Sequence, residues 1–89
     1  MKANFNQLQV EVAFDEYKPI NVTRDLGNFI HANTNDIGLD DVAREIYHSK
    51  GEIEILDEYA SMIEAMVMNP QCPLLAAIKK AIINELTKE

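Results

Sequence analysis

The sequence predicts a single α+β domain in which four helices pack with a small sheet. Short stretches of alternating apolar residues, typical of half-buried strands, occur near the N-terminus and again mid-chain. Four longer stretches carry apolar residues three or four positions apart, as in amphipathic helices. The 89 residues suffice for one domain, 1–89. The expected element order is β-β-α-α-β-α-α.

An N-terminal hairpin is expected to contain the first two strands. Residues 8–14 alternate apolar with polar or small side chains. Four apolar side chains of this strand should therefore share one buried face: Leu8, Val10, Val12 and Phe14. Residues 19–22 form the second strand, with Pro19 suited to its start or to a sheet edge. A loop of about four residues would connect the two strands.

The four helices are expected over residues 24–33, 39–49, 58–69 and 74–87. Side-chain oxygens of Thr, Asp or Asn often accept hydrogen bonds from the free N–H groups that begin a helix. The expected caps of the first three helices are Thr23, Asp40 or its neighbour, and Asp57. Pro73 suits the first turn of the fourth helix.

Residues 52–55, Glu-Ile-Glu-Ile, predict a third strand with both isoleucines inward and both glutamates outward. A lone strand cannot satisfy its backbone hydrogen bonds, so we expect this strand to join the N-terminal hairpin. The alternative is that residues 51–56 are an extended connector within a mostly helical bundle.

Negative charge is concentrated in residues 36–64. This segment holds nine acidic residues against Arg44 and Lys50, and its sum of −7 equals the formal net charge of the chain. The predicted acidic surface contains four candidate contact residues: Asp41, Glu45, Glu52 and Glu54. This charge argues against direct nucleic-acid binding, which requires several Lys or Arg against phosphates.

No catalytic, cofactor-binding or metal-binding motif is expected. His31 and His48 are interpreted as surface or helix-cap residues, and neither is spaced with Cys72 as in a metal site. The calcium-loop pattern that begins at Asn33 fails, because Arg44 stands where a bidentate Glu is required. Cys72 is expected to be a small buried residue rather than a reactive thiolate. A small enzyme is therefore only a third hypothesis, and it would require a pocket with a buried titratable group.

The sequence also predicts a cytoplasmic protein. No apolar run approaches the roughly 20 residues of a membrane span. The first residues lack the apolar centre of a signal peptide. The single cysteine cannot form an internal disulfide.

The last two helices carry more apolar surface than one core face requires. Several methionines make residues 58–69 apolar on more than one side, and Ile83 lies outside both apolar edges of residues 74–87. Core packing and contact with another chain explain this surplus equally well. Met68 and Ile83 are the apolar residues we expect at an interface.

Three runs carry a resemblance: residues 20–31 (INVTRDLGNFIH), residues 36–39 (DIGL) and residues 43–47 (AREIY). Through them the chain resembles small uncharacterised proteins encoded by prophages and other mobile elements of gut bacteria. The resemblance covers positions 20–56 and implies a mobile-element context without any catalytic residues. The leading hypothesis is a non-enzymatic interaction or accessory protein that binds a protein partner or a second copy. The alternative is an acidic nucleic-acid mimic that inhibits a basic nucleic-acid-binding protein.

Overall fold

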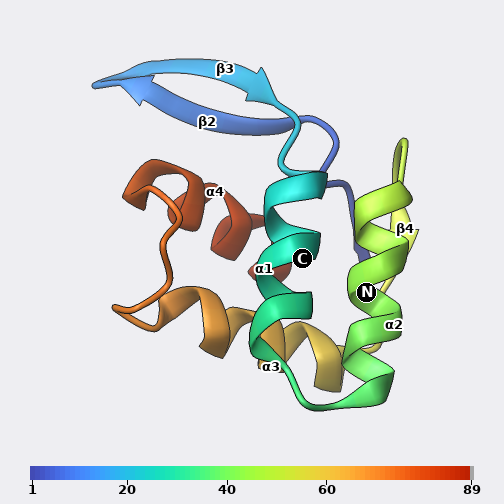
Figure 1. Cartoon of the computed structure of the whole chain (residues 1–89). Coiled ribbons are helices and arrows are strands. Elements are labelled where there is room, and N and C mark those ends of the chain that lie inside the picture. Colours follow the sequence, from blue (N-terminus) through green and yellow to red (C-terminus); the bar gives the residue numbers. More distant parts are fainter. Residues whose placement is uncertain (89) are drawn as a thin grey trace.

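The computed structural model describes residues 1–88, and it confirms the α+β class and the predicted order of the helices. One additional short strand precedes the hairpin. In chain order the elements are β1 (Lys2–Ala3), β2 (Leu8–Ala13), β3 (Glu16–Ile20), α1 (Thr23–Asn33), α2 (Ile37–His48), β4 (Ile53–Glu54), α3 (Asp57–Met68) and α4 (Ala76–Thr87). Figure 1 shows the hairpin of β2 and β3 projecting along one side of the helices.

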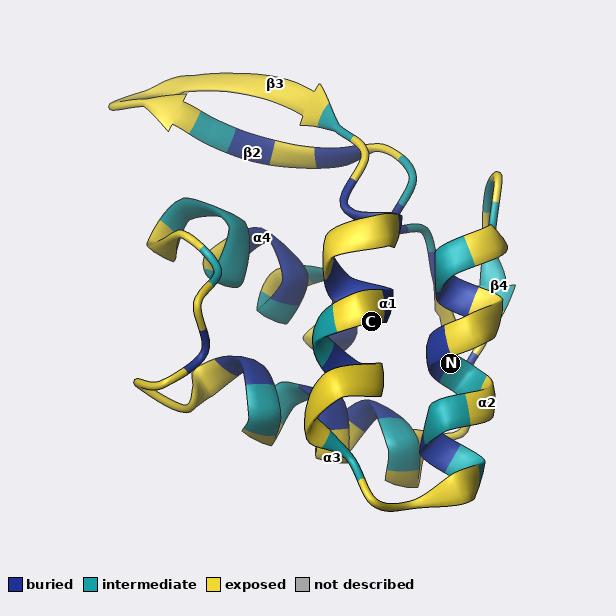
Figure 2. Ribbon diagram, in the orientation of Figure 1, coloured by how far each residue is buried: buried dark blue, intermediate teal, exposed yellow. Residues whose placement is uncertain are grey.

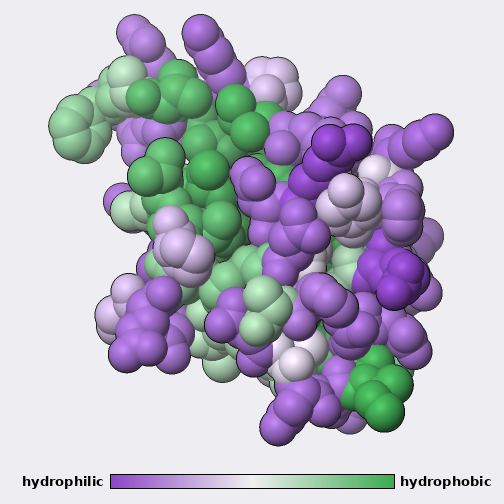
Figure 3. All heavy atoms as spheres, viewed as in Figure 1, coloured by the Kyte–Doolittle hydropathy of each residue, from purple (hydrophilic) through white to green (hydrophobic). Residues whose placement is uncertain are grey.

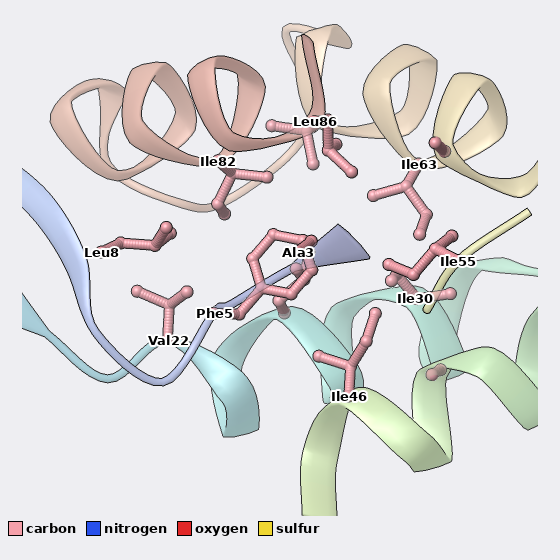
Figure 4. Close-up of a cluster of buried hydrophobic side chains, with 14 of the residues drawn as sticks. Ala3, Phe5, Leu8, Val22, Ile30, Ile46, Ile55, Ile63, Ile82 and Leu86 are labelled. Carbon is pink, nitrogen blue, oxygen red and sulfur yellow. The ribbon is translucent and has the colours of Figure 1, made fainter. Parts of the chain in front are cut away.

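The helices form two pairs, and the N-terminal segment lies between them. α1 packs along α2, and α3 packs against α4. Figure 4 shows Ala3 and Phe5 in the middle, with Ile63 and Ile82 on one side and Ile46 on the other. Ala3 and Phe5 are both 0% exposed. The first residues of the chain therefore form the centre of the core rather than a polar terminus.

The third predicted strand is present, but its partner differs from the predicted one. β4 pairs antiparallel with β1, with Ala3 opposite Ile53. Two backbone hydrogen bonds of 2.7 Å, one in each direction, continue this pairing between Met1 and Ile55. The described chain thus holds two separate two-stranded sheets, so the prediction that this strand joins the hairpin was wrong. A strand as short as β1 has no alternation that would identify it in the sequence.

The hairpin extends beyond the helices that support it. Leu8 and Val10 are buried where β2 packs on α4, whereas Val12 is 46% exposed and Phe14 is 93% exposed (Figure 2). The prediction of one buried face along the whole strand was therefore wrong for its last two apolar residues. The loop is also shorter than expected: Ala13 pairs with Glu16. Asp15 in this tight turn has a φ of 65°.

Two of the predicted helix caps were wrong because the helices begin one residue earlier. The N-cap of α1 is Val22, and the Thr23 hydroxyl instead donates to Asn21 Oδ1 at 2.7 Å. The N-cap of α3 is Leu56, which makes no side-chain capping bond. Asp57 stands in the first turn of α3, where its charge suits the positive end of the helix dipole.

The other two helices also begin at residues that differ from the prediction. α2 begins earlier than expected, because Asp36 Oδ1 accepts a 2.9 Å hydrogen bond from the Leu39 N–H. Asp40 is therefore a first-turn residue and not the cap. α4 begins later, with Leu75 as its N-cap, so Pro73 precedes the helix.

Phe5→Ala should lower the free energy of unfolding by about 3–5 kcal/mol, because it leaves a cavity between the two helix pairs. A chain of this length has a total stability of roughly 4–13 kcal/mol, so much of the fold depends on this side chain. Urea denaturation followed by circular dichroism measures the difference.

Phe14→Ala is the matched control, since it removes the same side chain where it is 93% exposed. At low protein concentration this control should change stability by less than about 0.5 kcal/mol. An equal decrease in the free energy of unfolding in the two variants would contradict the central position of Phe5.

Candidate functional site

A surface pocket of about 190 Å³ lies between α1 and α2. Its lining comes from one stripe of each helix: Gly27, Asn28 and His31 from α1, and Asp40, Arg44, Tyr47 and His48 from α2. Residues three or four positions apart share a helix face, so the local fold alone aligns each stripe. We call this site the α1–α2 pocket.

Gly27 allows the two helices to approach closely at the pocket. A Cβ atom placed on Gly27 would lie 2.9 Å from the Ala43 carbonyl oxygen and 2.9 Å from Tyr47 Cβ. These distances are too short for a real side chain, and one of the two atoms belongs to the backbone. The absence of a side chain at Gly27 therefore sets the spacing of α1 and α2.

His31 and Asp40 form a polar contact at one end of the pocket. His31 Nδ1 lies 2.5 Å from Asp40 Oδ1. An ionised carboxylate only accepts hydrogen bonds, so the proton of this contact belongs to Nδ1. The contact fixes the orientation of the imidazole ring and leaves Nε2 as its second nitrogen. It is an ion pair when the ring is protonated.

Aromatic and cationic groups form the other end of the pocket. The ring centroids of Tyr47 and His48 are 4.9 Å apart, at an angle of 76° between the ring planes. The guanidinium carbon of Arg24, in the first turn of α1, lies 5.8 Å from the Tyr47 ring centroid. Arg44 lies one helical turn from both Asp40 and His48 along α2. Both arginines and both histidines of the chain therefore gather on this pair of helices.

Sequence reasoning missed this site because it treated His31 and His48 as unrelated surface residues. Both are indeed exposed and lie near the ends of their helices. The sequence does show that each helix carries a row of polar residues at helical spacing. These residues recur at i, i+4 and i+7 in Arg24, Asn28 and His31, and at i, i+4 and i+8 in Asp40, Arg44 and His48. That the two stripes face each other depends on how α1 packs against α2.

Cys72 lies outside this pocket. It is buried, which confirms the prediction of a small buried cysteine. It lines a second pocket, together with residues such as Phe29 and Met66. Across residues 1–88, no group of three His, Cys, Asp or Glu side chains is placed to hold a metal ion.

The predicted interface residues lie on several elements. Met68 ends α3 and is 60% exposed, whereas Ile83 in α4 is half-buried and packs against the core. The four predicted acidic contacts are all exposed and lie on α2, on β4 or between them: Asp41, Glu45, Glu52 and Glu54. Whether any of these residues contacts a partner stays a prediction.

Exposed apolar side chains gather at one end of the molecule. Figure 1 shows the hairpin tip, the start of α4 and the end of α3 together on the left of the view. Figure 3 shows a hydrophobic area that runs from the hairpin onto α4, while the α1 and α2 side is mainly hydrophilic. The large exposed apolar residues of these segments, which we call the apolar end, are Val12, Phe14, Tyr17, Met68 and Leu75.

Comparisons with protein-family models, curated proteins and solved structures found no match to this chain. Among residues 1–88, none of the helices combines the length and the hydrophobicity needed to cross a membrane. A function for the chain therefore has to be inferred from its own surfaces, namely the α1–α2 pocket, the apolar end and the acidic residues.

Gly27→Ala should lower the free energy of unfolding by about 1–3 kcal/mol, because the added methyl group overpacks the contact between α1 and α2. In an isolated helix the same change would stabilise by roughly 0.5–1 kcal/mol. Thermal or urea denaturation measures whether the substitution raises or lowers the free energy of unfolding. A decrease shows that the contact between α1 and α2 is tight at Gly27.

Gly51→Ala is the control, because a Cβ at Gly51 would meet nothing within 4 Å. This variant should stay within about 0.5 kcal/mol of the parent chain. A stabilised Gly27→Ala protein would contradict the close approach of the two helices.

Proposed function

We propose that this chain is a non-enzymatic interaction protein that associates with a second copy of itself through the apolar end. The observation that carries the proposal is Phe14, an aromatic side chain that is 93% exposed at the tip of the hairpin. Full burial of such a side chain contributes about 1.5–3 kcal/mol relative to exposure. A partner surface that covers the hairpin tip would provide this burial.

A second copy fits the apolar end because exposed apolar side chains stand on both the hairpin and the start of α4. Val12 and Phe14 project on the hairpin, and Leu75, which is 71% exposed, stands where α4 begins. In a two-fold symmetric pair, the tip of each copy lies against the start of α4 in the other copy. One surface then supplies both halves of the contact, as in most homodimers.

The charges of the two parts are complementary. The turn of the hairpin carries exposed Asp15 and Glu16, whereas the first turns of α4 carry Lys79 and the exposed Lys80. In the symmetric pair, the acidic tip of each copy would approach the basic start of α4 in the other. Such complementarity favours one orientation of the contact and speeds its formation.

A cytoplasmic location and an accessory role for a phage or mobile element belong to the same proposal. Cys72 is the single cysteine and is buried, which suits a compartment where thiols stay reduced. The accessory role rests on the expected resemblance of residues 20–56 to prophage products, which stays a prediction.

Sedimentation velocity of the full chain over a range of concentrations should show a monomer–dimer equilibrium. Phe14→Ser should weaken dimerisation by at least about 100-fold, because a symmetric dimer loses two buried aromatic side chains. Ile37→Ser is the matched control, since Ile37 is 82% exposed at the start of α2, outside the apolar end. A strict monomer at all concentrations, or equal effects of the two substitutions, would contradict self-association through this surface.

A second candidate function is an acidic mimic of nucleic acid that occupies the basic groove of a nucleic-acid-binding protein. It is favoured by the four exposed carboxylates on α2, on β4 and between them: Asp41, Glu45, Glu52 and Glu54. Figure 1 shows α2 and β4 on the side away from the hairpin tip, so these groups would stay accessible in a dimer.

The mimic hypothesis predicts that the chain displaces a DNA duplex from a histone-like basic protein, measured by fluorescence anisotropy of labelled DNA. Displacement should weaken steeply as salt rises, because salt screens charges beyond about 8–10 Å. A variant with the four carboxylates changed to amides should lose the effect, and the Phe14→Ser variant should keep it. Displacement that is insensitive to salt, or unchanged in the amide variant, would count against mimicry.

A further inference from the structure

We propose that the α1–α2 pocket binds the phosphate monoester group of a small molecule. Arg44 is the principal ligand, and the imidazole rings of His31 and His48 line the pocket on either side of it. The site differs from the apolar end and does not depend on self-association.

The first observation is the convergence of the nitrogen-bearing side chains. Histidines and arginines number only four in the chain, and His31, Arg44 and His48 line this pocket. The fourth, Arg24, lies against the ring of Tyr47, which is itself a lining residue. The chain as a whole carries a formal charge of −7, so this is a local excess of donors on an acidic molecule.

The second observation is that the arginines are not engaged by acidic side chains of their own chain. Over residues 1–88, the ion pairs involve the Met1 nitrogen, His31 and Lys88, and neither arginine takes part in one. A guanidinium group presents five N–H donors in a planar fork that matches two oxygens of a phosphate. The fork of Arg44 is therefore available to an anion that enters the pocket.

Asp40 is the one acidic residue in the lining, and its contact with His31 reduces its repulsion of an anion. Its Oδ1 faces His31 Nδ1 at 2.5 Å, so the carboxylate holds the imidazole ring in place. The contact leaves Nε2 as the ring nitrogen that does not face Asp40.

The size of the pocket limits the ligand. A volume of about 190 Å³ is smaller than typical sites for drug-sized ligands, which measure roughly 300–1,000 Å³. It suits a phosphate with a small organic group, and the ring of Tyr47 offers an apolar surface for that group. Two terminal oxygens of a phosphate monoester can accept from the fork of Arg44, and the third remains for another N–H donor of the lining. A carboxylate has only two oxygens, so phosphate is the better match.

The test uses the full chain labelled with ¹⁵N, titrated with inorganic phosphate, phenyl phosphate or acetate. Backbone and histidine-ring signals are followed by NMR. Saturable shifts should occur at residues that line the α1–α2 pocket, with phenyl phosphate binding more tightly than phosphate and acetate binding more weakly. The proposal is overturned if no saturable shift occurs there, or if acetate binds as tightly as phosphate.

Two variants distinguish specific binding in the pocket from a general effect of positive charge on the chain. Arg44→Gln should weaken phosphate binding by at least about tenfold, because it removes a charge-assisted pair of hydrogen bonds. Lys2→Gln removes the same charge from an exposed residue of β1 and should leave the affinity within about twofold. Arg44 is exposed, so its replacement should leave the fold intact, which circular dichroism checks. Equal affinities of the two variants would overturn the assignment of Arg44.

Discussion

The burial of the N-terminal segment between the two helix pairs is the constraint on which the rest of the structure depends. Phe5 lies between the pairs, and its carbonyl oxygen accepts a 2.9 Å hydrogen bond from the Val22 N–H at the start of α1. The Asn4 N–H donates to Glu85 Oε2 of α4 at 2.7 Å. Met1 pairs with Ile55 beside β4. One short segment thereby joins elements from the beginning, middle and end of the chain.

This arrangement determines which surfaces remain exposed. α1 and α2 cover one side of the N-terminal segment. Gly27 permits these two helices to approach closely, and the residues that line the α1–α2 pocket lie on their solvent side. The hairpin follows directly after the buried segment, so it is held where β2 meets α4. Its strands continue past that contact, which leaves Phe14 in solvent. The pocket and the apolar end are therefore both consequences of where the first residues of the chain are buried.

The apolar end, the acidic residues and the α1–α2 pocket differ in the kind of interaction that they offer. The apolar end offers hydrophobic burial, which is not directional but is strong for its area. The acidic residues offer long-range forces that salt weakens. The α1–α2 pocket offers directed N–H donors from Arg44 and the two histidines. The proposed contact with a macromolecule and the proposed contact with a small anion therefore use different surfaces of the chain.

The sequence by itself determined the helices, the hairpin and the acidic character of residues 36–64, because periodicity and charge are local properties. It identified Leu8 and Val10 as buried, and Cys72 as well. Only the tertiary structure decided that Phe5 is central, that β4 pairs with β1, and that His31 and His48 share one pocket. Each of these facts joins residues far apart in the chain. A local pattern shows which face of an element is apolar, but packing decides which other element that face meets.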